Sequence, residues 1–209
     1  MIDTPTLFIR LVNVLREVEK TSSRNKKIKT LSSFLNELEP VEISPAILLI
    51  AGSIFPEGDR RVLEVSWVTL SKMLDKGRQM TLQRSPLTIT HLYSQLEEVA
   101  ALSGKGSRSK KEAILLSLLS QASEPEAEYI TRILLGELRV GLAEGLILEA
   151  TADAANVGID LVRRAYTLTG DLGDTAKRAI TEHEEGLKNI DLRLFEPVKP
   201  MLADTAPDL

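Results

Sequence analysis

The sequence predicts an all-α fold, and three observations lead to this prediction. Apolar residues recur at intervals of three and four along most of the chain, which gives a helix one apolar face. Helix start and stop signals border these stretches, such as Thr4–Pro5 before the first and Gly52 after the third. No stretch shows the sustained alternation between turn signals that marks a strand. With 209 residues and 43% hydrophobic content, the chain is long enough to bury a core.

Each helix is placed where an apolar repeat follows a capping or first-turn signal. Thr4–Pro5 precedes the first helix, Ser44–Pro45 is expected to open the third, and Asp160 and Asp174 are predicted caps of the last two. In chain order, the predicted helices cover about 7–18, 31–38, 44–52, 61–75, 88–102, 109–122, 125–138, 142–154, 158–169 and 174–185.

Composition excludes several kinds of site. The chain has no cysteine, so it offers no disulfide framework, thiolate metal site or cysteine nucleophile, which fits a reducing cytoplasmic location. His91 and His183 are far apart in sequence, and no metal site can be assembled around either. No apolar run approaches a membrane span, and the N-terminus does not read as a signal peptide, so no membrane contact is expected. The net charge of −4 still permits a local basic face.

One basic stretch occurs twice. "SRNKKIKTLSSFL" (Ser23–Leu35) and "SRSKKEAILLSLL" (Ser107–Leu119) align at an offset of 84 residues. Without a gap, the same offset aligns Gly52 with Gly136. Internal repeats reveal architecture, so we predict a compact domain built from two pseudo-repeated helical halves facing a common surface. The matched residues are Ser23 and Ser107, Arg24 and Arg108, Lys26 and Lys110, Lys27 and Lys111, Leu31 and Leu115, and Leu35 and Leu119.

The charges in this repeat stand where they oppose helix stability. Lys and Arg at a helix N-terminus work against the helix dipole, whereas the unpaired N–H groups there attract anions. Two such sites would suit a polyphosphate backbone better than one small anion. The competing interpretation is that each charge run is simply a solvated face.

A second stretch, "LRVGLAEG", lies between two predicted helices. Arg139 and Gly141 fall in the connection before Ala143, where a glycine allows the backbone to approach a ligand closely. The alternative is a tight helix–helix turn that needs glycine, with Arg139 acting as a partner of the helix dipole. Spacing alone leaves both interpretations open.

Taken together, "SGKGSRSKKEAILLSLL", "LLGELRVGLAEGLILEATADA" and "FEPVKPMLA" resemble the N-terminal DNA-binding domain of ATP-dependent DNA ligases of the archaeal type. The resemblance covers nearly the whole chain. It implies an all-helical domain over 1–194 that holds nicked duplex DNA across the minor groove. It also implies a linker over 195–209 leading into an adenylation domain that is not present here.

The same resemblance implies which residues bind DNA and what the parent enzyme does. Such ligases use ATP and Mg²⁺ to seal nicks in replication, repair and recombination, through a lysine in a K-x-D-G motif. This chain has no K-x-D-G and no P-loop, so we expect no catalytic residue, cofactor or metal in it, and a DNA-binding monomer that cannot seal nicks. The implied DNA-binding residues are Ser23, Arg24 and Lys27 in one phosphate site; Gly106, Ser107, Arg108 and Lys110 in a second; and Arg139, Gly141 and Ala143 against the minor groove.

The stretch "KGRQMTLQRSPL" interrupts the helical pattern at 76–87. Gln79, Met80 and Leu82 loosely resemble a motif with which archaeal ligases dock on the sliding clamp, although the paired aromatic residues of that motif are missing. The alternative is a solvated connector. For the whole chain, the competing function is a helical-repeat module that binds a protein partner and has no enzymatic role.

Overall fold

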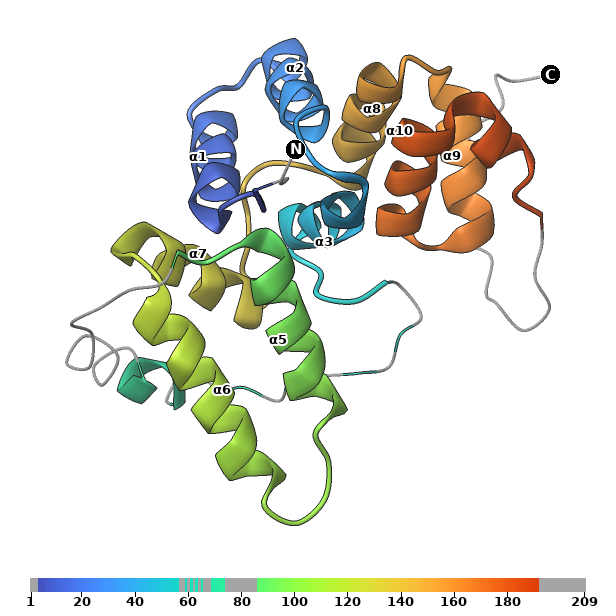
Figure 1. Ribbon diagram of the computed structural model, residues 1–209. Coiled ribbons are helices and arrows are strands. Elements are labelled where there is room, and N and C mark those ends of the chain that lie inside the picture. Colours follow the sequence, from blue (N-terminus) through green and yellow to red (C-terminus); the bar gives the residue numbers. More distant parts are fainter. Residues whose placement is uncertain are drawn as a thin grey trace, which may run out of the picture.

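The computed structural model describes residues 4–56, 59, 61, 63, 65, 69–73 and 86–191. The described part is all-α, as predicted; its one β-type pairing is an isolated antiparallel bridge between Leu7 and Thr88. Figure 1 shows the helices as a closely packed assembly. Their bounds are α1 Phe8–Glu19, α2 Arg24–Leu35, α3 Pro40–Ala51, α5 Ile89–Ala101, α6 Ser107–Gln121, α7 Glu124–Leu134, α8 Glu144–Ala155, α9 Ile159–Thr169 and α10 Leu172–Lys188.

The predicted duplication is visible in where the helices begin. α3 starts at residue 40 and α7 at residue 124, which is the 84-residue offset found in the sequence. α2 and α6 start at residues 24 and 107, one residue off that register. Gly52 and Gly136, which follow α3 and α7, both have left-handed backbones, with φ of +72° and +67°. The helical triplets α1–α3 and α5–α7 therefore correspond to the two halves.

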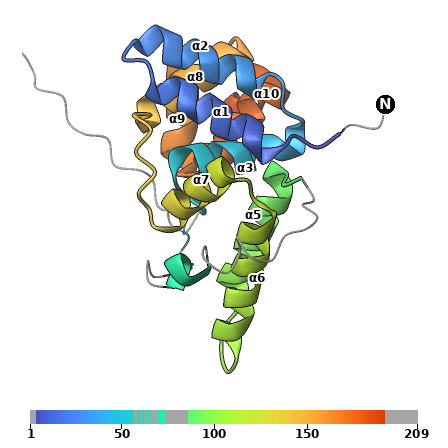
Figure 2. The same ribbon diagram turned by 90° about the vertical axis from the view of Figure 1, so that its left-hand side faces the viewer.

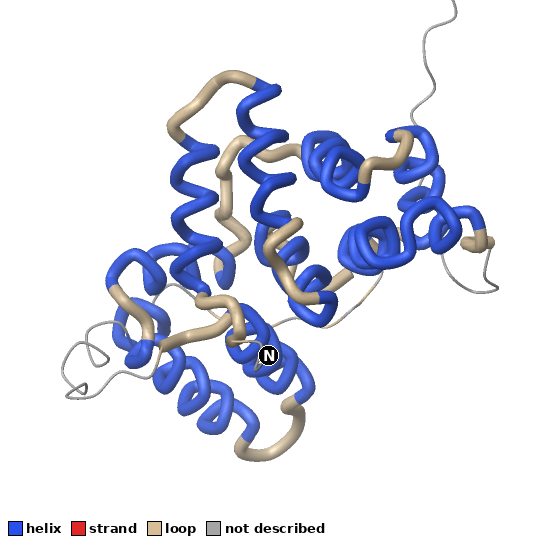
Figure 3. The backbone as a smooth tube through the Cα atoms, turned by 45° about the horizontal axis from the view of Figure 1, so that its top comes forward, coloured by secondary structure: helices blue, strands red, loops and turns tan. Residues whose placement is uncertain are grey.

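The last three helices lie outside this duplication. α8 packs on α2, α10 packs on α3, and α9 packs on both α8 and α10. Figures 1 and 3 show this group gathered beside the first half, whereas α5 and α6 lie on the other side of α3. α5 and α6 pair with each other and form an arm that projects from the body in Figure 2. The C-terminal helices thus cover the first half of the repeat.

Side chains of α1 and α7 hold the two halves together. Tyr129 is 1% exposed and donates its hydroxyl to Glu19 at 2.6 Å. Arg132 also donates to Glu19, at 2.7 Å, and its guanidinium lies 4.8 Å from the Tyr129 ring centroid. Burial, together with the hydrogen bond to Glu19, raises the pKa of the Tyr129 phenol to about 12. The phenol therefore stays a hydrogen-bond donor at all ordinary pH values.

The segment before α1 is tied to α3 and to the segment before α5. The carboxylate of Glu42, only 2% exposed, accepts hydrogen bonds from the Thr6 backbone N–H at 2.6 Å and the Thr6 hydroxyl at 2.7 Å. It also accepts from the N–H of Glu39 at 3.2 Å, completing a capping box at the start of α3. Backbone bonds run from Phe8 N–H to Leu87 and from Ile89 N–H to Thr6.

Several predicted helix ends are wrong. α3 begins at Pro40 instead of Ser44–Pro45, because the Glu39–Glu42 capping box starts the helix earlier and Pro45 lies inside it. Pro45 has no N–H and cannot donate to the carbonyl of Val41, one turn back; the Val41 residue as a whole is 66% exposed.

The predicted caps Asp160 and Asp174 are also wrong, since both lie inside the first turns of their helices. Gly158 precedes α9, and the Asp171 side chain accepts from the Asp174 N–H at 2.9 Å to cap α10. α10 is broken at His183, where φ is 53° and ψ is −140°.

Three further predictions concern the helix at 61–75, the linker at 195–209 and the clamp-like residues of the loop at 76–87. In the predicted helix 61–75, residues 61, 63 and 65 are not helical, whereas 69–73 are. The proposed linker 195–209 and the clamp-like residues Gln79, Met80 and Leu82 lie outside the described residues.

Candidate nucleic-acid interface

The first predicted site lies at the N-terminus of α2 and contacts α8. Ser23 caps α2, its hydroxyl accepting from the Lys26 N–H at 3.4 Å. Arg24 donates to Glu149 on α8 through Nε at 3.1 Å and Nη2 at 2.5 Å. The Arg24 side chain is nevertheless 62% exposed. A guanidinium has five N–H groups, so Arg24 keeps donors for a second anion while Glu149 fixes its position.

Lys27 joins this site to the stretch that contains Gly141. Lys27 Nζ donates to the Gly141 carbonyl at 2.8 Å, across 114 positions of sequence. The structure therefore brings two of the three predicted residue groups together. The connection between α7 and α8, residues 135–143, is an extended strap rather than a tight turn, and Figure 2 shows it along the left-hand edge of the molecule.

The backbone conformation of Gly141 favours glycine. Its φ is +68°, a conformation that costs other L-residues about 1 kcal/mol or more, whereas the nearest atom to an added Cβ is the flexible end of Lys27, with Nζ at 2.7 Å. We expect Gly141→Ala to lower the free energy of unfolding by about 1 kcal/mol, measured by urea denaturation. The control is Gly145→Ala on α8, where a Cβ meets nothing within 4 Å and stability should stay level or rise. Equal stability of the two variants would contradict the expectation.

The other two strap residues are accessible. Arg139 is exposed and makes no hydrogen bond or ion pair with any residue that the structure describes. Ala143 is the N-cap residue of α8 and is also exposed. Because alanine has no side-chain acceptor, the first turn of α8 has no side-chain cap. The strap therefore offers a guanidinium that has no partner among the described residues, and it leads into the first turn of α8, which has no side-chain cap.

The second predicted site lies at the N-terminus of α6. Gly106 is the N-cap with φ of +83°, and no side chain caps the helix. Ser107 is thus the first helical residue and not the cap that Ser23 provides in α2. Arg108 is 86% exposed and donates Nε to Glu112 at 3.1 Å, a pair within one helix. Lys110 is exposed and has no partner among the described residues.

The two duplicated sites stand at different ends of the molecule. In Figures 1 and 2, α2 lies at the top and the loop leading into α6 lies at the bottom. One small anion cannot bridge them, whereas an extended polyanion running along the molecule could touch both. That Arg24 and Arg108 serve one ligand stays a prediction.

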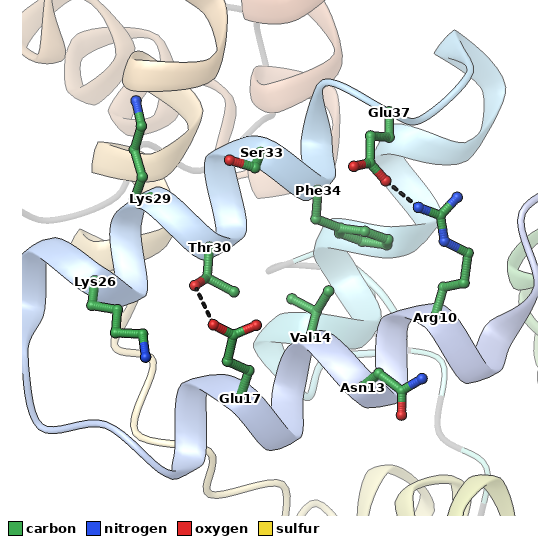
Figure 4. Close-up of a pocket in the computed structure, with 10 residues that line it drawn as sticks. All are labelled: Arg10, Asn13, Val14, Glu17, Lys26, Lys29, Thr30, Ser33, Phe34 and Glu37. Carbon is green, nitrogen blue, oxygen red and sulfur yellow. Dashed lines mark hydrogen bonds and ion pairs between the residues drawn. The ribbon is translucent and has the colours of Figure 1, made fainter.

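No sequence pattern predicted the groove between α1 and α2, shown in Figure 4. Arg10 pairs with Glu37 across it, and Thr30 donates to Glu17 at 3.3 Å. Lys26 and Lys29 line its other end. Mixed charges and internal pairing give this groove no preference for ligands of one sign.

Other kinds of site are not supported within the described ranges. No three His, Cys, Asp or Glu side chains there gather in an arrangement that could hold a metal ion. Nor is any helix in those ranges long and apolar enough to cross a membrane.

The fold and the candidate site define an all-helical domain that presents arginines at two helix N-termini and on a glycine-containing strap. Residues 7–77 and 68–152 match the family model described as DNA ligase N terminus, and the chain belongs to this family. It is 37% identical to a DNA ligase of Methanobrevibacter smithii over 95% of this chain and 41% of that ligase. It is 35% identical to a DNA ligase of Methanothermobacter thermautotrophicus, over 97% of this chain and 42% of the ligase. A ligase of Thermococcus fumicolans is 33% identical, over 95% of this chain and 41% of its own length. The chain thus spans about two fifths of these archaeal relatives.

Proposed function

We propose that this chain is the DNA-binding domain of an ATP-dependent DNA ligase and holds duplex DNA around a nick. The observation that carries the proposal is the convergence of Arg24, Lys27 and the Gly141 strap at one surface, in a chain of the ligase N-terminal family. The whole enzyme would seal nicks in replication, repair and recombination, using ATP and Mg²⁺ bound outside this chain.

Each part of the interface has a separate role in binding. Uncapped helix N-termini at α6 and α8 direct N–H groups and partial positive charge toward a phosphate. Arg24, Arg108 and Arg139 supply full charges, which fix position without reading sequence. Gly141 and Ala143 lack bulky side chains, so the strap can approach the floor of a minor groove. The expected result is binding with little sequence preference.

The same proposal includes the oligomeric state, location and partners of the chain. We expect it to be a monomer in the cytoplasm. We also propose a contact with the sliding clamp through Gln79, Met80 and Leu82, which loosely resemble the clamp-binding motif. We expect no catalytic residue in this chain, so incubation with ATP and Mg²⁺ should leave it without a covalent AMP adduct.

A titration of nicked duplex DNA tests the proposal directly. Counterion release makes the logarithm of the binding constant fall linearly with the logarithm of salt concentration, by about 0.9 per phosphate contacted. We expect binding in moderate salt with a steep negative slope and nearly equal affinities for two unrelated sequences. A chain that binds no DNA at low salt, but captures a protein partner, would instead be an interaction module.

A further inference from the structure

Glu149 joins Arg24 to a second arginine that the sequence did not single out. Its Oε1 accepts from Arg24 Nη2 at 2.5 Å and from Arg163 Nη2 at 3.3 Å, while Oε2 accepts from Arg24 Nε at 3.1 Å. One carboxylate therefore links α2, α8 and α9. The Glu149 side chain is 20% exposed, whereas those of Arg24 and Arg163 are 62% and 50% exposed.

Two guanidiniums directed at one oxygen repel each other unless an anion lies between them. Glu149 supplies that anion, and both arginine side chains remain half exposed or more. The remaining contact of Arg163 is loose: its Nη1 is 3.6 Å from Asp160, whose side chain is 95% exposed. Such a surface pair contributes little and is readily exchanged for a stronger anion. The pair of arginines thus forms a fork whose open side can accept a phosphate.

The position of α9 matches this role. Figure 2 shows α9 on the same side of the molecule as the strap and the N-terminus of α2. The contacts of Glu149 with Arg24 and of Lys27 with Gly141 place the N-terminal turn of α2 beside both α8 and the strap. A phosphate strand lying on the first site would therefore pass α9.

We propose that Arg163 binds a DNA phosphate and extends the interface from α2 across α8 onto α9. Glu149 is the positioning residue that holds Arg24 and Arg163 together. This inference rests on the proposed function, because it adds one contact to the same DNA-binding surface.

The test compares Arg163→Ala with Arg164→Ala in the full chain, using a short nicked duplex at several salt concentrations. Both variants lose one charge from adjacent exposed positions of α9, and Arg164 makes no contact with Glu149 among the described residues. We expect Arg163→Ala to reduce the salt slope by about 0.9 and to weaken binding about fivefold at 0.15 M salt. Arg164→Ala should leave the slope unchanged, and Arg163→Lys should restore most of it. Thermal unfolding of each variant checks that the fold is retained.

The outcomes separate the two proposals. If Arg163→Ala and Arg164→Ala give the same slope, Arg163 makes no phosphate contact and this inference fails. The proposed function would still stand in that case, provided that Arg24→Ala lowers the slope. If the unaltered chain shows no salt-dependent DNA binding, the proposed function itself fails.

Discussion

Replacing Arg24, Arg108 and Arg139 together by alanine is expected to weaken binding to nicked DNA on the order of 100-fold at 0.15 M salt. The physical reason is counterion release, which gives each phosphate contact roughly fivefold in affinity at this salt concentration. The same three changes should reduce the magnitude of the salt slope by about 2.7. Fluorescence anisotropy with a labelled nicked duplex, repeated over a range of salt concentrations, measures both quantities.

The control removes the same charge from elsewhere. Arg164, Lys177 and Lys188 are exposed cations outside the predicted sites, and their triple alanine variant has the same net charge. We expect that variant to keep a slope close to that of the unaltered chain. Equal losses in the two triple variants would mean that DNA responds only to overall charge, and the assignment of the three arginines would be rejected.

Replacing Glu42 by alanine is expected to lower the free energy of unfolding by about 3 kcal/mol or more, because hydrogen bonds to a buried charged group contribute about 1.5–3 kcal/mol each. The Glu42 carboxylate accepts from the backbone N–H and the hydroxyl of Thr6, which is itself 9% exposed. Without Glu42, both Thr6 donors lose their acceptor in a nearly closed site. Urea denaturation followed by circular dichroism measures the change.

Glu39→Ala is the matched control for Glu42→Ala. Glu39 belongs to the same capping box but is exposed, so its loss should cost only about 1 kcal/mol, as for an ordinary helix cap. Comparable losses in the two variants would show that Glu42 acts only as a helix cap and does not hold the start of the chain. DNA affinity of the folded Glu42→Ala protein should be unchanged.

The helices were predictable because their signals are local. An apolar face repeats within a few residues, and the 84-residue repeat aligns the starts of α3 and α7, although α2 and α6 start one residue off that register. The ends of helices were less predictable where two signals compete. Pro40 and Pro45 are both compatible with a first helical turn, and the choice depends on Glu42, whose carboxylate also binds Thr6 across 36 positions.

The candidate site was likewise predictable where its features are local and unpredictable where they depend on contacts between distant parts of the chain. Exposed basic residues at the starts of α2 and α6 follow from local spacing, and the structure places them there. The partners of these residues do not follow from spacing. Arg24 meets Glu149 across 125 positions, and Lys27 meets Gly141 across 114. These pairs form only because α8 packs on α2, and no local sequence pattern around Glu149 or Arg163 predicts them.

The arm formed by α5 and α6 gives the two ends of the molecule unequal local stability. α6 buries only Leu115, Leu118 and Leu119, whereas α3 buries seven residues and is covered by α10. Segments with few buried apolar contacts open at a lower free-energy cost than the global transition. We therefore expect the start of α6, which carries Arg108, to open at a lower free-energy cost than α2 and α8, so that this end of the cationic surface adapts its shape more readily than the other.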